Sequence, residues 1–144
     1  VALQFVLLGV LFTAPRLPDP YGALTPFISL LGLSLMAVAG VILLVSFAAL
    51  GNSLTALPLP KQRGTLVTTG LYAHVRHPIY SGLLLLSLGV VLDAGWWPQL
   101  VVALMLFLLL RIKAQFEESL LRKAYPKYAA YASKTPMFFP RLGK

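Results

Sequence analysis

The amino-acid sequence predicts an all-α integral membrane protein with about four transmembrane segments, a helical hairpin and a cytoplasmic C-terminal amphipathic helix. Apolar residues make up 58% of the 144 residues and charged residues only 11%, whereas soluble domains carry about a quarter charged residues. No Lys, Arg, Asp or Glu occurs within residues 20–60, 77–92 or 94–110. Stretches this apolar suit the bilayer core. The length is that of one domain, which we assign to residues 1–144.

Two apolar segments precede the first polar connection, which covers residues 51–77. Residues 1–13 are apolar but short for a span of about 20 residues. A loop follows them, because it contains three prolines that cannot continue a helix. Residues 25–50 form the clearest transmembrane helix. Its small residues are expected to serve close helix packing: Ser29, Gly32, Ser34, Ala37 and Gly40.

The second half of the chain predicts a helical hairpin. Pro78 suits the first turn of a helix over residues 78–92, and Asp93-Ala94-Gly95 predicts a tight turn. Residues 96–110 return across the membrane, with Trp96 and Trp97 in an interfacial aromatic belt.

An amphipathic pattern follows Arg111. It predicts one helix that ends near Ser133, because apolar and aromatic residues recur on one helical face: Leu120, Leu121, Ala124, Tyr128 and Tyr131. Pro136 and Pro140 then predict an extended tail.

The basic residues predict the orientation. Eleven of the 12 Lys and Arg residues lie in the connection 51–77 or from Arg111 onward, and Arg16 lies on the opposite side. The positive-inside rule places the connection and the tail in the cytoplasm. We therefore expect a protein of the cell inner membrane whose active site faces the cytoplasm. The net charge of +8 reflects this asymmetry and does not indicate a nucleic-acid partner.

Topology alone predicts where chemistry sits. The start of the third segment and the end of the fourth are neighbours in a hairpin. A pocket at the membrane surface is therefore expected to gather the following residues: Tyr72, His74, Arg76, His77, Tyr80, Lys113, Glu117 and Glu118. Ionisable residues that cluster at the membrane surface of a helix bundle indicate a functional site.

Simpler explanations exist for each group. Arg76 can extend to lipid head groups, His77 can cap a helix, and the two glutamates can balance basic residues on a solvated face. A metal site of His74, His77 and a glutamate is disfavoured, because neither histidine belongs to an H-E-x-x-H pattern. The chain has no cysteine and no two glycines closer than six positions, so thiolate chemistry, G-x-G-x-x-G and P-loop motifs are excluded.

The run from Gly64 to Gly82 contains Arg76-His77-Pro78-Ile79-Tyr80, and 36 residues separate Tyr80 from the pair Glu117-Glu118. This series, with the tyrosines of the tail, resembles the isoprenylcysteine carboxyl methyltransferase family over residues 60–140. The related phospholipid N-methyltransferases share part of it.

The resemblance implies S-adenosylmethionine as cofactor, bound between the hairpin, the preceding loop and the C-terminal segment. Glu117 would accept hydrogen bonds from the ribose diol, while His77 and Tyr80 would donate to the methionine carboxylate. The implied cofactor-binding residues are Gly64, Thr65, Leu66, Val67, Tyr72, His77, Pro78, Ile79, Tyr80 and Glu117. Lys113 stands where the eukaryotic enzymes have a substrate-contacting arginine, and Arg111 is nearby, so both are implied in catalysis. No metal is implied.

The predicted function is methyl transfer to a lipophilic molecule or lipid that arrives from the bilayer, with carboxylate O-methylation of an isoprenylcysteine-like molecule foremost. One alternative is N-methylation of a phospholipid or other amine, which needs a base such as Glu118 or His74. Membrane sterol-type reductases share the R-H-P-x-Y element but need room for a dinucleotide. A small structural or transporter subunit is the non-enzyme alternative.

Overall fold

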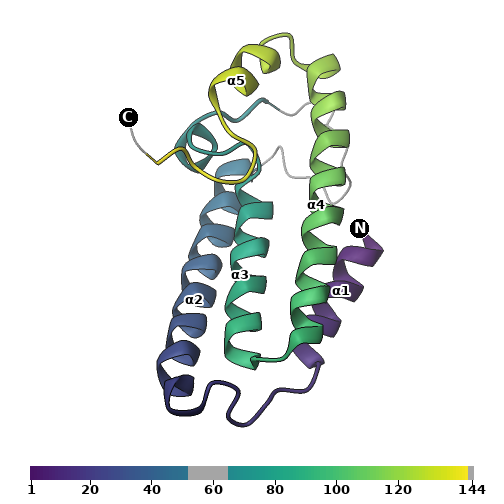
Figure 1. The fold of residues 1–144 in the computed structure, drawn as a ribbon. Coiled ribbons are helices and arrows are strands. Elements are labelled where there is room, and N and C mark those ends of the chain that lie inside the picture. Colours follow the sequence, from purple (N-terminus) through teal and green to yellow (C-terminus); the bar gives the residue numbers. More distant parts are fainter. Residues whose placement is uncertain (52–64, 143–144) are drawn as a thin grey trace.

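The computed structural model describes residues 1–51 and 65–142, and this part of the chain consists of helices joined by loops, without a strand (Figure 1). The α-helices are α1 (Ala2–Thr13), α2 (Thr25–Leu50), α3 (Pro78–Ala94), α4 (Trp97–Ala124) and α5 (Tyr128–Lys134). Two short 3-10 helices are η1 (Gly22–Leu24) and η3 (Gly70–Ala73). The predicted all-α class is confirmed.

The four longer helices run up and down beside one another (Figure 1). Helix α3 packs along α2 on one side and against α4 on the other, and α1 packs mainly against α4. Helix α5 and the tail lie at the end where α3 begins, together with η3. The candidate functional residues therefore gather at one end of the bundle.

The predicted hairpin is confirmed as α3 and α4. Gly95 closes α3 in the left-handed conformation (φ 63°), and its N–H donates to the Val91 carbonyl at 3.0 Å. Arg16 forms an ion pair with Asp93 at this turn, and the Leu17 N–H donates to the Ala94 carbonyl at 3.1 Å. The loop after α1 therefore fastens the closed end of the hairpin, opposite the candidate site.

The prediction of one amphipathic helix from Arg111 to about Ser133 is wrong in its continuity. Helix α4 continues without a break from the apolar segment to Ala124, and Tyr125 then adopts an extended conformation (φ −127°, ψ 108°). The cause is Pro126, whose ring disfavours the helical conformation at the preceding residue. The chain resumes as the short helix α5, which turns back over the end of the bundle.

Two helices are long and apolar enough to cross a membrane, namely the segments Gly22–Leu50 and Trp97–Ala124, whereas α1 and α3 are apolar but shorter. Many apolar side chains of the two long segments face outward. Phe27 and Leu44 of α2, for example, are 70% and 72% exposed. Water-soluble proteins rarely expose continuous apolar surfaces of this extent. The protein is therefore a membrane protein.

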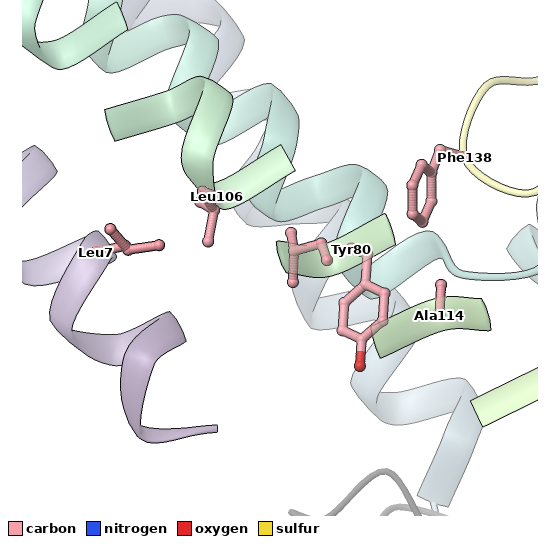
Figure 2. Close-up of a cluster of buried hydrophobic side chains, with 6 residues drawn as sticks. Leu7, Tyr80, Leu106, Ala114 and Phe138 are labelled. Carbon is pink, nitrogen blue, oxygen red and sulfur yellow. The ribbon is translucent and has the colours of Figure 1, made fainter. Parts of the chain in front are cut away.

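A cluster of buried side chains connects the helices to the candidate site (Figure 2). Its members come from α1, α3, α4 and the tail: Leu7, Tyr80, Leu106, Leu110, Ala114 and Phe138. Tyr80 belongs both to this core and to the polar site beside it, so packing fixes the direction of its ring.

Helices α2 and α3 cross closely at two glycines. A Cβ on Gly89 would lie 2.6 Å from the Gly32 carbonyl oxygen and 2.6 Å from the Met36 Cγ. The predicted packing role of Gly32 is thus confirmed, whereas a Cβ on Gly40 would meet nothing within 4 Å. Small residues at such crossings let two backbones approach.

This contact predicts that Gly89→Ala destabilises the fold by about 1–3 kcal/mol, because the clash is with backbone that cannot rotate away. Thermal unfolding in detergent should show a melting temperature lower by several degrees. Gly40→Ala is the matched control and should be neutral or slightly stabilising, since alanine favours helix. Equal melting temperatures for the two variants would contradict the close crossing.

Candidate functional site

The site begins where the chain enters α3. Pro78 occupies the first turn of α3, and His77 precedes it without capping the helix through its side chain. The Arg76 N–H donates to the Pro136 carbonyl at 2.8 Å, and the His77 N–H donates to the Met137 carbonyl at 3.1 Å. The extended tail, predicted from its prolines, therefore runs alongside this segment and holds it in place.

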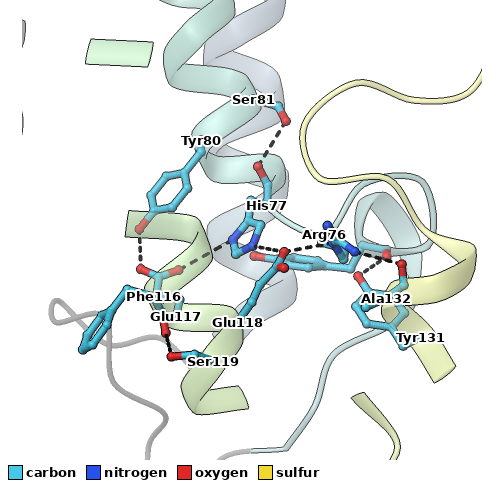
Figure 3. A network of polar contacts seen from close by, with 11 residues as sticks. Arg76, His77, Tyr80, Ser81, Phe116, Glu117, Glu118, Ser119, Tyr131 and Ala132 are labelled. Atoms are coloured by element: carbon cyan, nitrogen blue, oxygen red, sulfur yellow. Dashed lines mark hydrogen bonds and ion pairs between the residues drawn. The ribbon is translucent and has the colours of Figure 1, made fainter. Parts of the chain in front are cut away.

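Two adjacent glutamates of α4 face this segment (Figure 3). Glu118 Oε1 lies 2.9 Å from Arg76 Nε and 3.0 Å from His77 Nε2. Glu117 accepts a hydrogen bond from the Tyr80 hydroxyl, and its Oε2 lies 3.6 Å from His77 Nδ1. The imidazole of His77 thus lies between two carboxylates, and its ring stacks on that of Tyr80 with centroids 5.5 Å apart.

The two carboxylates differ in their exposure to solvent. The side chains of His77 and Glu118 are only 7% and 8% exposed, whereas that of Glu117 is 20% exposed. Buried charges need partners, so removal of Arg76 or His77 would leave the Glu118 carboxylate buried with one partner fewer. The explanation that the glutamates merely balance a solvated face is therefore wrong for Glu118. The Glu117 side chain remains partly exposed.

Helix α5 and η3 complete the wall around Arg76. A terminal nitrogen of Arg76 donates to the Ala132 carbonyl at 2.8 Å, and the Tyr131 hydroxyl donates to the Tyr72 carbonyl at 2.5 Å. Burial raises the pKa of Tyr131 from its ordinary value of 10.0 to about 12. The pKa of Tyr72 is likewise raised to about 12, mainly by burial. Both hydroxyls are therefore protonated at neutral pH, and that of Tyr131 remains a donor.

Lys113 lies on the other side of Tyr80. Its Nζ donates to Gln4 Oε1 of α1 at 2.5 Å and lies 5.2 Å from the centroid of the Tyr80 ring. Gln4 was missed at the sequence level, although a lone amide in an apolar segment was a signal for it. Arg111 is exposed, and among the described residues no hydrogen bond or ion pair connects it to this cluster.

The cofactor residues implied by the resemblance fall into three groups. Tyr72, His77, Tyr80 and Glu117 gather at the mouth of the hairpin. Pro78 is buried and Ile79 packs against the hydrophobic cluster, so both shape the site from behind. Thr65 is exposed, Val67 is half-buried, Leu66 lines a cavity, and Gly64 lies outside the described residues.

The cavity has a volume of about 440 Å³, within the range of small-molecule sites. It lies at the same end of the protein, because Tyr131 belongs both to its wall and to the contacts around Tyr72. Its lining residues are Leu66, Thr68, Tyr125, Pro126, Lys127 and Tyr131. The disfavoured metal site gains no support, since the described residues contain no group of three or more metal-ligating side chains.

A helical membrane protein with a compact polar site at one end of its hairpin is the class that fold and site define. A family model described as phospholipid methyltransferase matches residues 27–128. The chain belongs to this family, which is related to the isoprenylcysteine carboxyl methyltransferases, and the resemblance seen in the motif is confirmed.

Two metal-resistance proteins are similar to the chain. The cobalt-zinc-cadmium resistance protein CzcN of Cupriavidus metallidurans is 34% identical over 144 residues, which cover 99% of this chain and 62% of that protein. The nickel-cobalt-cadmium resistance protein NccN of Alcaligenes xylosoxydans xylosoxydans is 34% identical over 101 residues, 68% of this chain and 47% of that protein. The chain thus spans less than two thirds of the length of these relatives.

The burial of Glu118 predicts that Glu118→Gln destabilises the protein by about 3 kcal/mol, because it leaves the Arg76 guanidinium buried without its counter-charge. Glu117→Gln should cost about 1 kcal/mol or less, since an amide oxygen still accepts from Tyr80. Unfolding of both variants in detergent at neutral pH measures the difference. Equal losses would show that the two carboxylates are not divided in this way.

Proposed function

We propose that the protein is a methyltransferase that binds S-adenosylmethionine at the open end of the α3–α4 hairpin and methylates a lipophilic acceptor. The observation that carries the proposal is the combination of contacts and exposure at Glu117. Its carboxylate is held by Tyr80 and His77, yet it remains partly exposed among groups that are buried. Membership of a methyltransferase family supports the same reaction class.

The residues present fit this cofactor. A ribose diol needs an acceptor with more than one lone pair, and the Glu117 carboxylate retains lone pairs beyond the one used by Tyr80. An adenine ring needs flat or apolar walls, which Leu66, Tyr125 and Tyr131 supply around the cavity of about 440 Å³. The implied donors His77 and Tyr80 are engaged with the glutamates, so we assign them to orienting Glu117.

When bound, the cofactor supplies a methyl group on a positively charged sulfur. The protein contributes position and exclusion of water. Arg76, His77 and Glu118 hold the start of α3 against α4, so that Tyr80 and Glu117 keep a fixed geometry. Such pre-set orientation accounts for a large share of the rate in reactions that need little proton transfer.

The acceptor that we propose first is an isoprenylcysteine-like carboxylate. An ionised carboxylate arrives ready to react, whereas an amine must first lose a proton to a base. Of the two bases considered from the sequence, Glu118 is buried and paired with Arg76, and His74 is exposed. Lys113, which lies over the Tyr80 ring, is the cation that would attract and orient the anion. We assign no catalytic role to Arg111.

Amine N-methylation of a phospholipid is the second candidate, because the matching family model carries that description. The names of the two relatives concern metal resistance. A contribution of this chain to such resistance would come through a modified membrane component, since the described residues hold no group of three metal ligands.

We further propose that α1, α2, α3 and α4 all cross the inner membrane, with the site in the cytoplasm. The distribution of basic residues supports this orientation. Lys113 lies over the Tyr80 ring, Lys127 lines the cavity, and Lys134 belongs to α5, which lies at the end of the bundle that carries the site. The shorter α1 and α3 would then be accommodated by a locally thinner bilayer.

The orientation predicts opposite labelling of two ends of the bundle. The chain has no cysteine, so single cysteines can be placed without removing others. In intact cells, a membrane-impermeant maleimide should react with Leu17→Cys but not with Thr68→Cys or Lys134→Cys, and cell lysis should expose the latter two. Labelling of Lys134→Cys in intact cells would contradict the cytoplasmic site.

Cofactor binding is tested by titration calorimetry in detergent. Glu117→Gln should weaken S-adenosylmethionine binding by about 1–3 kcal/mol, because a charge-assisted acceptor is replaced by a weaker one. Thr13→Val, at the other end of α1, is the control and should bind like the parent. A folded Glu117→Gln variant with the parental affinity for S-adenosylmethionine would show that Glu117 does not bind the cofactor.

The acceptor class is tested on Lys113. With a prenylcysteine analogue, Lys113→Met should lower kcat/KM about tenfold or more, because the orienting charge is lost, while cofactor affinity stays parental. Methylation of ethanolamine lipids serves as the comparison and should not depend on Lys113 in this way. A parent protein that methylates only ethanolamine lipids would establish the amine alternative instead.

A further inference from the structure

Helix α1 contains one buried polar side chain that the proposed function does not use. Gln4 is 9% exposed, whereas the other polar side chain of α1, Thr13, is exposed and donates to the Gly9 carbonyl of its own helix. A carboxamide withdrawn from water costs free energy unless it finds a partner. The hydrogen-bond partner of Gln4 therefore indicates what its side chain does.

That partner is a charged residue of the site. Gln4 Oε1 accepts a hydrogen bond from Lys113 Nζ at 2.5 Å. An ammonium group can only donate, so the carboxamide must present its oxygen to Lys113. This contact is the polar link between α1 and α4 at the level of Tyr80.

The contact determines where the ammonium lies. A lysine head group sits on a flexible four-carbon chain and loses rotamer entropy when it is held in one place. Here the same Nζ donates a hydrogen bond to Gln4 and lies 5.2 Å from the centroid of the Tyr80 ring, so two contacts restrain it. Tyr80 in turn donates to Glu117, so the position of Lys113 is coupled to the proposed cofactor side.

We propose that Gln4 is a positioning residue that holds the Lys113 ammonium over Tyr80 and leaves its remaining N–H donors for an anionic acceptor. This inference rests on the proposed function, in which Lys113 orients the acceptor. The neutrality of Gln4 matters, because an amide oxygen fixes the direction of the ammonium without cancelling its charge, whereas a carboxylate would do both.

A purely structural role is the alternative. In that case Gln4 would only fasten α1 to α4, its loss would lower the melting temperature, and the folded fraction would bind and methylate the acceptor as the parent does. The two roles are separated by a readout at Lys113 itself and by the kinetics of the acceptor.

The first test needs no catalysis. The detergent-solubilised protein is treated with limiting acetic anhydride, and modification of Lys113 relative to the exposed Lys123 is measured by mass spectrometry. Gln4→Leu should raise this ratio about tenfold, since the ammonium loses its hydrogen bond, and Thr13→Val should leave it at the parental value. An unchanged ratio in Gln4→Leu overturns the proposal, whether or not methyl transfer is detected.

The second test is kinetic. With a prenylcysteine analogue, Gln4→Leu should raise KM about tenfold while kcat and the Kd of S-adenosylmethionine change little. Gln4→Glu should restore the protection of Lys113 from acetylation but not the low KM, because the carboxylate neutralises the ammonium. Additive losses in the double variant Gln4→Leu/Lys113→Met would show that Gln4 acts independently of Lys113 and would overturn the positioning role.

The two hypotheses fail separately. A parent that transfers no methyl group to any carboxylate refutes the proposed acceptor, while the acetylation ratio still decides whether Gln4 positions Lys113. A Gln4→Leu variant with a raised ratio but a parental KM refutes the role in acceptor binding and leaves the proposed methyl transfer intact.

Discussion

A single buried carboxylate holds the open end of this bundle together. Glu118 Oε1 lies 2.9 Å from Arg76 Nε and 3.0 Å from His77 Nε2, in a site almost closed to solvent. A charge in such a place is tolerated only when its partners are fixed, so the loop before α3 must dock against α4. Arg76 extends the constraint through its backbone and side chain to the tail and to α5. The geometry of the site follows from this docking.

The neighbouring carboxylate, Glu117, remains partly exposed, and helix geometry explains the difference. Consecutive residues on an α-helix point about 100° apart, so the side chains of Glu117 and Glu118 leave α4 in different directions. One points to Arg76 and is buried, while the other meets Tyr80 and stays partly exposed. His77 lies between them and contacts both, which couples the stability of the fold to the geometry of the site (Figure 3). Two adjacent glutamates therefore differ in their contacts and in their burial.

Much of this architecture could be predicted from the sequence, because charge-free stretches and prolines are strong signals for apolar helices and their ends. The hairpin mouth followed from topology, since the start of α3 and the end of α4 must meet. The break at Tyr125 was overlooked, although Pro126 was its signal. Two features depend on how α1 and the tail pack, and a local sequence pattern does not encode that packing. They are the hydrogen bond between Lys113 and Gln4 and the different burial of Glu117 and Glu118. The backbone hydrogen bonds between the tail and the residues Arg76 and His77 do not depend on side-chain type, so the sequence does not predict them.

The central claim is that a nucleoside cofactor binds between the start of α3 and the end of α4. Photolabelling of the purified protein with radiolabelled S-adenosylmethionine, followed by mapping of the labelled peptides, tests it most directly. We expect saturable label within residues 65–80 or 113–131, which excess unlabelled cofactor removes. Label confined to α1 or α2, or label that the unlabelled cofactor does not displace, would contradict it.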